Sequence, residues 1–235
     1  AVMLADLLSG DFHSNAAEGM FKCKREDYNK NHWSGMRRNS KYVTFGVLFW
    51  RGARSLYAPT PGQGGNLGKL YSLRELEEMV NAWHARYWMH RDWSNDEVRK
   101  AQRTGEQTNL AGRKRRYHAP GVYGGHFQNM AANWPVQSLS HDHLIAARLD
   151  LDRLYRANVF PARSLWDGHD AIYFECDEDS NTVNEAVGLI REVMQKPRWF
   201  DFGIPVEIKV GRDWADAKEI KVNQVWKDGG IYGST

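Results

Sequence analysis

The spacing of apolar residues changes once along this chain, and that change limits the folds open to it. Up to about residue 156 apolar side chains recur every three or four positions, which is the period of a helix packed on one face. Beyond residue 161, two short strand-like runs, "ARSLWD" and "AIYFEC", meet at a "GHD" turn. A helix is predicted over 182–195, and "IPVEIKVG" then alternates apolar and polar residues. The sequence therefore predicts an α+β fold: a mostly helical part at 1–130, and a part at 131–235 with an antiparallel sheet built as hairpin, helix and strand.

Capping signals predict where several helices begin. The first helical segment is predicted to run to about Phe21. Ser34 is predicted to be the N-cap of a helix over 35–50. Ser72 and Glu75 have the spacing of a capping box for the next well-marked helix, and Pro135 is predicted to occupy the first turn of a later one.

Charge is unevenly distributed, although the net charge is only +3. Seven basic residues and one acid, Glu106, lie between Arg99 and Arg116, and they include a predicted basic turn at 109–120. A Gly- and Pro-rich stretch at 58–70 departs from the spacing of a phosphate-binding loop and is predicted to be an insertion loop. Ten tryptophans, ten tyrosines and nine phenylalanines indicate a surface used for stacking or for a large interface. The clustering of basic residues between Arg99 and Arg116 favours a polyanionic partner.

A stripe of two cations and two rings occupies every fourth position of the helix at 35–50: Arg37, Lys41, Phe45 and Phe49. Residues at this spacing lie along one side of a helix. A nucleoside triphosphate would match the stripe, with its phosphates on the cations and its sugar and base on the rings. Gly46 would leave room for its close approach. The alternative is a helix whose cations are solvated and whose rings lie in the core.

The "GHD" turn is the candidate metal site. Asp170, held at the tip of a hairpin, would present a carboxylate to a hard cation such as Mg²⁺, which keeps most of its waters. The alternative is that Asp170 serves only as a turn former. Asp167 and Glu175 are weaker candidates. No spacing of histidines or cysteines matches a zinc site, and no nucleophile motif is found.

The two cysteines, Cys23 and Cys176, have no spacing that suggests a disulfide framework, so we expect a reducing cytoplasm, that of the host if the source is viral. The sequence shows no membrane-spanning run and no signal peptide, and a membrane partner is not expected.

Several collinear segments together resemble the family A, or Pol I-like, DNA polymerases. They are "GDFHSNAA", "RRNSKYVTFG" (motif B of the fingers), "TNLAGRKRRY", "NWPVQS", "GHDAIYFE" within 165–176 (motif C of the palm) and "IPVEIKVGRDWADAKE". The resemblance implies a fingers subdomain at 1–130 and a C-terminal palm portion at 131–235. It implies template-directed DNA synthesis, in which a dNTP is added to a primer 3′-OH, with primer–template DNA and dNTPs as partners.

The resemblance also implies roles for single residues. Arg37 and Lys41 would hold the triphosphate, with Lys41 protonating the leaving pyrophosphate. Phe45 would contact the incoming nucleotide and select against dideoxynucleotides, and Phe49 would lie at the template position. The catalytic set implied is Asp170, which binds Mg²⁺ in a two-metal mechanism, His169, which positions the primer end, and Lys41. The DNA-binding set implied is Asn133, Gln137, Arg113, Arg115 and Arg116.

The sequence departs from the family pattern in places. Ala171 stands where Glu is usual, Trp50 and Gly168 replace a glycine and an apolar residue, and Asn129 replaces an arginine. Motif A, with the second metal-binding aspartate, and the thumb are not in this sequence. We therefore expect the C-terminal piece of a split, phage-like polymerase or of a truncated one, active only with a second polypeptide that carries motif A and the thumb. The alternatives are a non-catalytic, polymerase-derived DNA-binding or replication accessory module, and kinship with single-subunit RNA polymerases.

Overall fold

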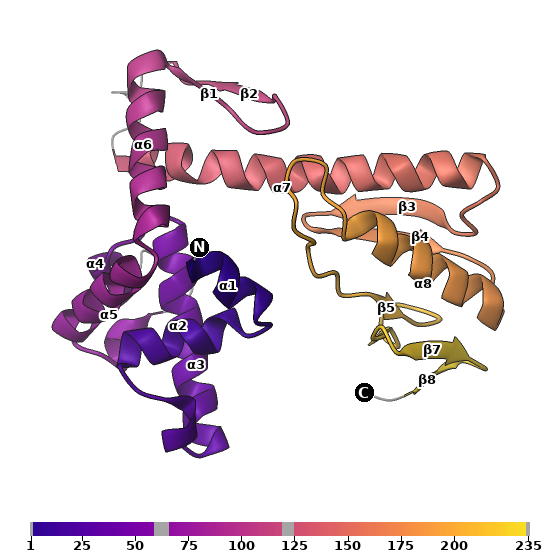
Figure 1. The fold of residues 1–235 in the computed structure, drawn as a ribbon, viewed down its shortest axis with the longest axis horizontal. Helices are drawn as coiled ribbons and strands as arrows, with labels where there is room; N and C mark the ends of the chain where they lie inside the picture. Colours follow the sequence, from indigo (N-terminus) through magenta and orange to yellow (C-terminus); the bar gives the residue numbers. More distant parts are fainter. Residues whose placement is uncertain (1, 59–65, 119–124, 234–235) are drawn as a thin grey trace. The chain divides into compact units, whose positions relative to one another are not determined.

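The computed structural model describes residues 2–58, 66–118 and 125–233, which form two compact units (Figure 1). The first unit draws on Ala1–Thr108 and Lys114–Pro135, and the second on Asn109–Arg113 and Val136–Thr235. Parts of the predicted insertion loop (59–65) and of the predicted basic turn (119–120) lie outside the described residues. The fold is α+β, as predicted, with helices and small antiparallel sheets.

The first unit is mainly helical. Its elements in chain order are α1 (Val2–Leu8), α2 (Phe12–Phe21), η1 (Arg25–Asp27), α3 (Lys30–Leu48), α4 (Ala53–Tyr57), η2 (Leu67–Lys69), α5 (Leu73–Arg86), α6 (Trp88–Thr104), β1 (Glu106–Thr108), β2 (Lys114–Arg116) and the first part of α7 (Gly125–Arg156). One core gathers side chains of α2, α3, α4 and α5, with Val43, Leu76 and Trp83 almost fully buried. A second core joins α6 to the start of α7 around Ala101 and Phe127.

The start of the chain forms two helices rather than the single one predicted. Gly10 takes a φ of +83°, which a residue with a side chain rarely adopts, and the chain turns there. Asp11 then caps α2, because its carboxylate accepts a hydrogen bond from the backbone N–H of Ser14 (3.2 Å). A break of three residues is too short to change the helical period, so the pattern of apolar residues did not reveal it.

The predicted N-cap at Ser34 is wrong. Helix α3 begins at Lys30, and its N-cap is Asn29, whose side chain accepts from the backbone N–H of His32 (2.9 Å). Asn is as good a cap as Ser, and the polar stretch before the helix offers both. The capping box of Ser72 and Glu75 at the start of α5 is confirmed.

Pro135 lies inside α7 and not in its first turn, which corrects the prediction. A proline has no N–H, so the carbonyl four residues earlier, that of Ala131, loses its usual helical donor. The buried Gln107 side chain of β1 donates to that carbonyl instead (2.9 Å). Gln107 in turn accepts from the hydroxyl of Tyr117 (2.5 Å). The helix continues through the proline because a side chain from another element supplies the missing donor.

The second unit contains the rest of α7, β3 (Arg163–Gly168), β4 (Ala171–Glu175), α8 (Ser180–Met194), β5 (Lys209–Val210), β6 (Lys218–Glu219), β7 (Gln224–Lys227) and β8 (Gly230–Gly233). Each consecutive pair of strands forms its own two-stranded antiparallel sheet. The core lies between α7, α8 and the strands, with Leu151, Phe160 and Ile220 almost fully buried. No helix within the described ranges combines the length and the apolar character that crossing a bilayer requires.

The predicted hairpin at "GHD" is confirmed, and the predicted strand at 204–210 is confirmed only in part. Gly168 pairs with Ala171, so His169 and Asp170 form the turn between β3 and β4. Residues 204–210 keep the alternation expected of a strand, with Ile208 buried and its neighbours exposed. Only Lys209 and Val210 find strand partners, in β6. Alternation reports which side is buried, but it does not by itself supply a neighbouring strand.

We expect Asp6→Ala to destabilise the first unit by about 2–3 kcal/mol. The substitution removes the buried carboxylate that accepts hydrogen bonds from both the Arg86 guanidinium and the Tyr87 hydroxyl, and leaves these two groups without that acceptor. Asp6 accepts from Arg86 Nε (2.9 Å) and from the Tyr87 hydroxyl (2.7 Å). The measurement is the unfolding free energy from urea titration. Glu78→Ala, which removes an exposed ion pair with Arg74, is the control and should change it by about 0.5 kcal/mol or less. Equal losses in both variants would contradict the role of Asp6.

Candidate functional site

The stripe predicted from the sequence lies on the solvent side of α3. The side chains of Lys41, Phe45 and Phe49 are exposed, with 42% of each phenylalanine accessible, and Arg37 is half-buried. The opposite face of the same helix is almost fully buried and carries Ser40, Val43, Thr44 and Val47. The alternative in which the two rings lie in the core is therefore wrong.

Asp11 connects the stripe to α2. Its carboxylate caps α2 and also accepts from Arg37 Nε (3.1 Å). Burial alone would raise the pKa of Asp11, but the hydrogen bonds from Ser14 and Arg37 outweigh it and lower that pKa. The carboxylate is therefore ionised at neutral pH, and it holds the Arg37 guanidinium at the α2 end of the stripe.

His13 lies beside the stripe, and the sequence analysis assigned it no role. Its ring centroid is 5.6 Å from that of Phe45, and its backbone carbonyl accepts from Ser40 Oγ (3.1 Å). Burial lowers the pKa of His13, and the charges of Lys41 and Arg37 lower it further against the opposing effect of Asp11. Its buried Nδ1 has no hydrogen-bond partner among the described residues. The signal that could have found it is the Asp-x-His-Ser match at the start of α2.

The aromatic end of the stripe is ordered along the helix. Lys41 Nζ lies 5.6 Å from the centroid of the Phe45 ring, and the rings of Phe45 and Phe49 are 6.4 Å apart and nearly parallel. Gly46 does not face the stripe, which corrects the expectation that it makes room for a ligand. It is buried, and a Cβ there would come within 2.6 Å of Leu56 Cδ2. The glycine allows α4 to pack closely against α3.

The second group of predicted residues lies at the turn between β3 and β4. The side chains of His169 and Asp170 are 96% and 84% exposed, and Nδ1 of the histidine is 3.7 Å from a carboxylate oxygen of the aspartate. His169 has a φ of +50°, an uncommon conformation for a residue with a side chain, and the paired strands on either side hold it. The turn thus presents one carboxylate and one imidazole to solvent.

The weaker metal candidates are engaged elsewhere. Asp167 pairs with Arg148 of α7, and Glu175 pairs with Arg163 across the hairpin. Within the residues that the structure describes, no three side chains of His, Cys, Asp or Glu are grouped so as to hold a metal ion. Asp170 therefore offers a single oxygen ligand of the kind that Mg²⁺ prefers, with room for waters and other ligands around it.

The predicted DNA-binding residues lie on α7 and on the hairpin of β1 and β2. Asn133 is half-buried and donates to the backbone carbonyl of Asn129 (2.7 Å), whereas Gln137 is exposed. Arg113 donates to Asp142 (Nε to Oδ1, 2.8 Å) and thereby lowers the pKa of that carboxyl. Arg115 stacks over Tyr117, with 5.1 Å from its guanidinium carbon to the ring centroid, and Arg116 is exposed.

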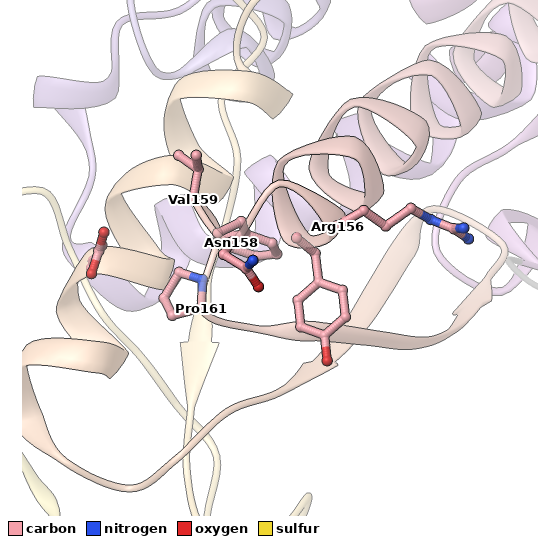
Figure 2. Close-up of a pocket in the computed structure, with 7 residues that line it drawn as sticks. Arg156, Asn158, Val159 and Pro161 are labelled. Carbon is pink, nitrogen blue, oxygen red and sulfur yellow. The ribbon is translucent and has the colours of Figure 1, made fainter.

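A hollow of about 430 Å³ lies in the second unit where α7 ends (Figure 2). Its lining includes Arg156, Asn158, Val159 and Pro161, and none of the residues predicted for the site. In Figure 2 the Arg156 side chain extends away from Val159 and Pro161, and its Nε donates to Asp152 (2.8 Å). The arginine that lines the hollow is therefore already paired with an acid, and the hollow does not include the residues considered above.

The family model "DNA polymerase family A" matches residues 4–216 of this sequence, a span that includes α3 and the turn at His169 and Asp170. The chain belongs to DNA polymerase family A. The six collinear segments that suggested the resemblance all lie within the matched residues or overlap them.

Relatives of this family A chain include the thermostable DNA polymerase I of Thermus filiformis, 30% identical over 78% of this chain, and DNA polymerase I of Geobacillus stearothermophilus, 25% identical over 88% of it. The chain spans 21% and 22% of the length of these relatives. A solved structure titled "POL domain of Pol1 from M. smegmatis complex with DNA primer-template and dNTP" shares the fold. It matches 90% of this chain and 35% of its own, with a TM-score of 0.69 and 22% identity.

The position of His13 beside the stripe predicts how its pKa responds to its neighbours. Lys41→Ala removes a nearby positive charge and should raise the pKa of His13, whereas Asp11→Asn removes the opposing negative charge and should lower it further. Titration of the imidazole resonances by NMR measures both shifts. Glu78→Ala, which removes an exposed charge that does not act on His13, is the control and should leave the pKa of His13 as it is in the parent protein. Shifts in the same direction for both variants would show that structural change, and not charge, dominates.

Proposed function

We propose that this chain forms the nucleotide-binding and primer-terminus parts of a DNA-directed DNA polymerase. In this reaction the primer 3′-oxygen bonds to the α-phosphorus of a dNTP, the bond from that phosphorus to the pyrophosphate breaks, and the 3′-OH proton is released. The observation that carries the proposal is the outward stripe on α3, in which Arg37, Lys41 and Phe45 lie in the order of phosphates, sugar and base. Membership in DNA polymerase family A supports it.

The triphosphate would bind at the cationic end of the stripe. Arg37 offers two or more N–H donors to phosphate oxygens, and its bond to Asp11 holds the guanidinium in place without neutralising the whole stripe. Lys41 supplies an exposed ammonium one turn further along and donates the proton that the leaving pyrophosphate needs. His13, kept neutral by burial and by these cations, can donate an N–H to the same phosphates. Phe45 and Phe49 would receive the sugar and base and the template position, respectively.

Asp170 would hold Mg²⁺ at the turn. The residues present fit such an ion in part: one exposed carboxylate suits a cation that binds few protein ligands and shares substrate phosphates. When bound, the metal ions supply positive charge that favours the 3′-alkoxide and the departing pyrophosphate. His169, beside Asp170 in the turn, would contact and position the primer end. Its Nδ1 lies 3.7 Å from a carboxylate oxygen of Asp170, so a primer end bound at the imidazole would lie close to the proposed metal ligand.

The duplex would be bound by side chains that read no particular sequence. Asn133 and Gln137 would donate to the minor groove, where every base pair offers acceptors. Arg115 and Arg116 would contact backbone phosphates, and so would Arg113 where a phosphate competes with Asp142 for its guanidinium. Cooperation between the stripe of the first unit and the turn of the second stays a prediction.

We further propose that a segment outside these 235 residues completes the catalytic centre. A single carboxylate at the turn does not hold two metal ions against the charge of a triphosphate. The residues that supply motif A and the thumb would come from a second polypeptide, as in a phage-like split polymerase, working in the cytoplasm. Unpaired Cys23 and Cys176 are compatible with a reducing compartment. Primer extension by the purified 235-residue chain with no other protein would contradict this part of the proposal.

A second candidate function is a non-catalytic module that binds DNA and derives from a polymerase. The observation in its favour is Ala171, which adds no second carboxylate beside Asp170. The nearby carboxylates of Asp167 and Glu175 are each paired with an arginine. Nucleotide binding separates the two functions. A polymerase binds dNTP more tightly when Mg²⁺ is present, and a module that only binds DNA does not.

Asp170→Ala should reduce nucleotide addition by the complete protein by at least about a thousandfold, because it removes a metal ligand, and should leave primer–template binding nearly unchanged. Primer extension and fluorescence anisotropy with labelled DNA measure the two quantities. Asp177→Ala is the matched control, since Asp177 is an exposed acid shortly after β4 and lies outside the turn. Extension by Asp170→Ala at the rate of the control would remove the metal assignment.

Lys41→Ala and Arg116→Ala should affect different steps. Loss of Lys41 should lower the rate of nucleotide addition at saturating DNA by about a hundredfold or more, because it removes a general acid. Loss of Arg116 should instead weaken DNA binding and reduce its salt dependence by about one counterion. Single-turnover extension and salt titrations of DNA binding separate the two. The reverse ranking would mean that the stripe binds the DNA backbone and the hairpin serves the active site.

A further inference from the structure

Three aromatic rings gather on one face of the hairpin that carries the His169–Asp170 turn. Trp166 of β3 and Tyr173 of β4 are paired across the hairpin, and their rings stack with centroids 4.4 Å apart and an interplanar angle of 7°. Trp214, from the segment between β5 and β6, lies 5.4 Å from the first ring and 5.0 Å from the second. We call these three residues the aromatic platform. All three belong to the second unit.

The platform is open to solvent although the hairpin has a buried side. Trp214 is 68% exposed to solvent, and Trp166 is 42% exposed. The opposite side of the hairpin faces α7 and the core: Phe174 packs edge-on against the buried Phe160, and Ser164 accepts from Arg148 of α7 (3.1 Å). Exposed tryptophan is costly in water, so a surface cluster of this kind calls for an explanation.

Gly168 explains how the platform reaches the turn. A Cβ at this position would lie 2.9 Å from Cζ3 of Trp166, so only a glycine lets the indole lie across the backbone here. The ring therefore covers the residue that directly precedes His169. Gly168 thus lets the ring of Trp166 extend the stack to the edge of the proposed primer site.

The size of the platform argues against a protein partner. Three aromatic side chains have roughly 450–750 Å² of surface in all, and part of it is already covered here. A stable protein partner covers about 800 Å² on each side. The surroundings are charged and internally paired: Arg163 with Glu175, Arg212 with Glu178, and Lys209 with Glu207 (3.0 Å). A small aromatic area with a neutralised rim fits the flat face of one or two nucleobases better than it fits a protein surface or a phosphate.

We propose that the aromatic platform of Trp166, Tyr173 and Trp214 is a stacking site for an unpaired nucleobase of a DNA strand that passes the His169–Asp170 turn. This inference rests on the proposed function for its choice of DNA as the source of the base. Stacking on aromatic rings tolerates every base, because each base has a π face, and purines offer the larger one. A frayed or single-stranded primer end would thus be held close to the turn without sequence preference.

The test compares strands that differ only in their bases. Fluorescence anisotropy measures binding of the complete protein to a labelled deoxyadenosine oligomer of about 12 nucleotides and to an abasic strand of equal length, without dNTP or metal. We expect the parent protein to prefer the strand that carries bases, and Trp214→Ala to reduce that preference about tenfold, which corresponds to about 1.4 kcal/mol. Trp214→Phe should keep most of it. Trp88→Ala removes an exposed tryptophan of α6 in the first unit and should leave the preference unchanged.

A second variant displaces a ring without removing one. Gly168→Ala introduces the Cβ that collides with Trp166, and it should also reduce the preference for bases. It keeps the test decisive if Trp214→Ala proves unfolded by circular dichroism. Equal binding of the two strands by the parent, or an unchanged preference in Trp214→Ala and Gly168→Ala, would overturn the proposal.

Other ligands give other results. Competition by free dAMP as effective, per base, as that by the oligomer would assign the platform to a mononucleotide and overturn the choice of a strand. A change in the assembly state of Trp214→Ala, seen by light scattering with base preference intact, would assign it to a protein contact and do the same. Because no dNTP or metal is present, this test can fail while primer extension persists, and it can succeed if Asp170→Ala shows no effect on extension. The two proposals are therefore tested separately.

Discussion

The burial of one face of α3 determines where its other face points, and the proposed nucleotide site depends on that orientation. Val43, Thr44 and Val47 are almost fully buried, and Ser40 is tied to the backbone of α2 at His13. Turning the helix by one residue, about 100°, would expose this face and bury cations. Each apolar side chain brought into water would cost about 1.5–3 kcal/mol. Core packing therefore directs the stripe outward. Exposed ion pairs such as that of Arg37 with Asp11 contribute little stability and adjust only the positions of single side chains.

In the hairpin of the second unit, strand register and not core packing determines which side chains face solvent. Register fixes which two residues form its turn, because Gly168 pairs with Ala171 and leaves only His169 and Asp170 between the strands. The paired strands β3 and β4 on either side of the turn hold His169 at its positive φ. Trp166, lying over the glycine, adds a stacked surface next to the turn. A carboxylate, an imidazole and an aromatic surface thus occupy neighbouring positions without any of them being buried.

Features set by local spacing could be predicted from the sequence, and features set by distant partners could not. The stripe on α3 and the capping box of α5 depend on residues within one or two helical turns, and both are present. The course of α7 through Pro135 depends on Gln107, a residue far away in sequence that donates to a carbonyl freed by the proline. Helix α6 was not predicted, since its buried residues are small: Ser94, Val98 and Ala101. The aromatic platform also escapes sequence patterns, because Trp214 joins the hairpin only in the folded unit.

The central proposal is that one dNTP is bound by the stripe on α3 and, through a metal ion, by the carboxylate of Asp170. Iron-mediated cleavage tests it most directly. Fe²⁺ replaces Mg²⁺ in the complete protein with primer–template and dNTP, and added hydrogen peroxide is reduced at the iron to hydroxyl radicals that cut the nearby backbone, while ascorbate returns Fe³⁺ to Fe²⁺. We expect cuts at the turn around Asp170 and also on α3 around Arg37 and Lys41, both dependent on dNTP and both lost in Asp170→Ala. Cleavage that is confined to the turn while dNTP is bound would contradict it.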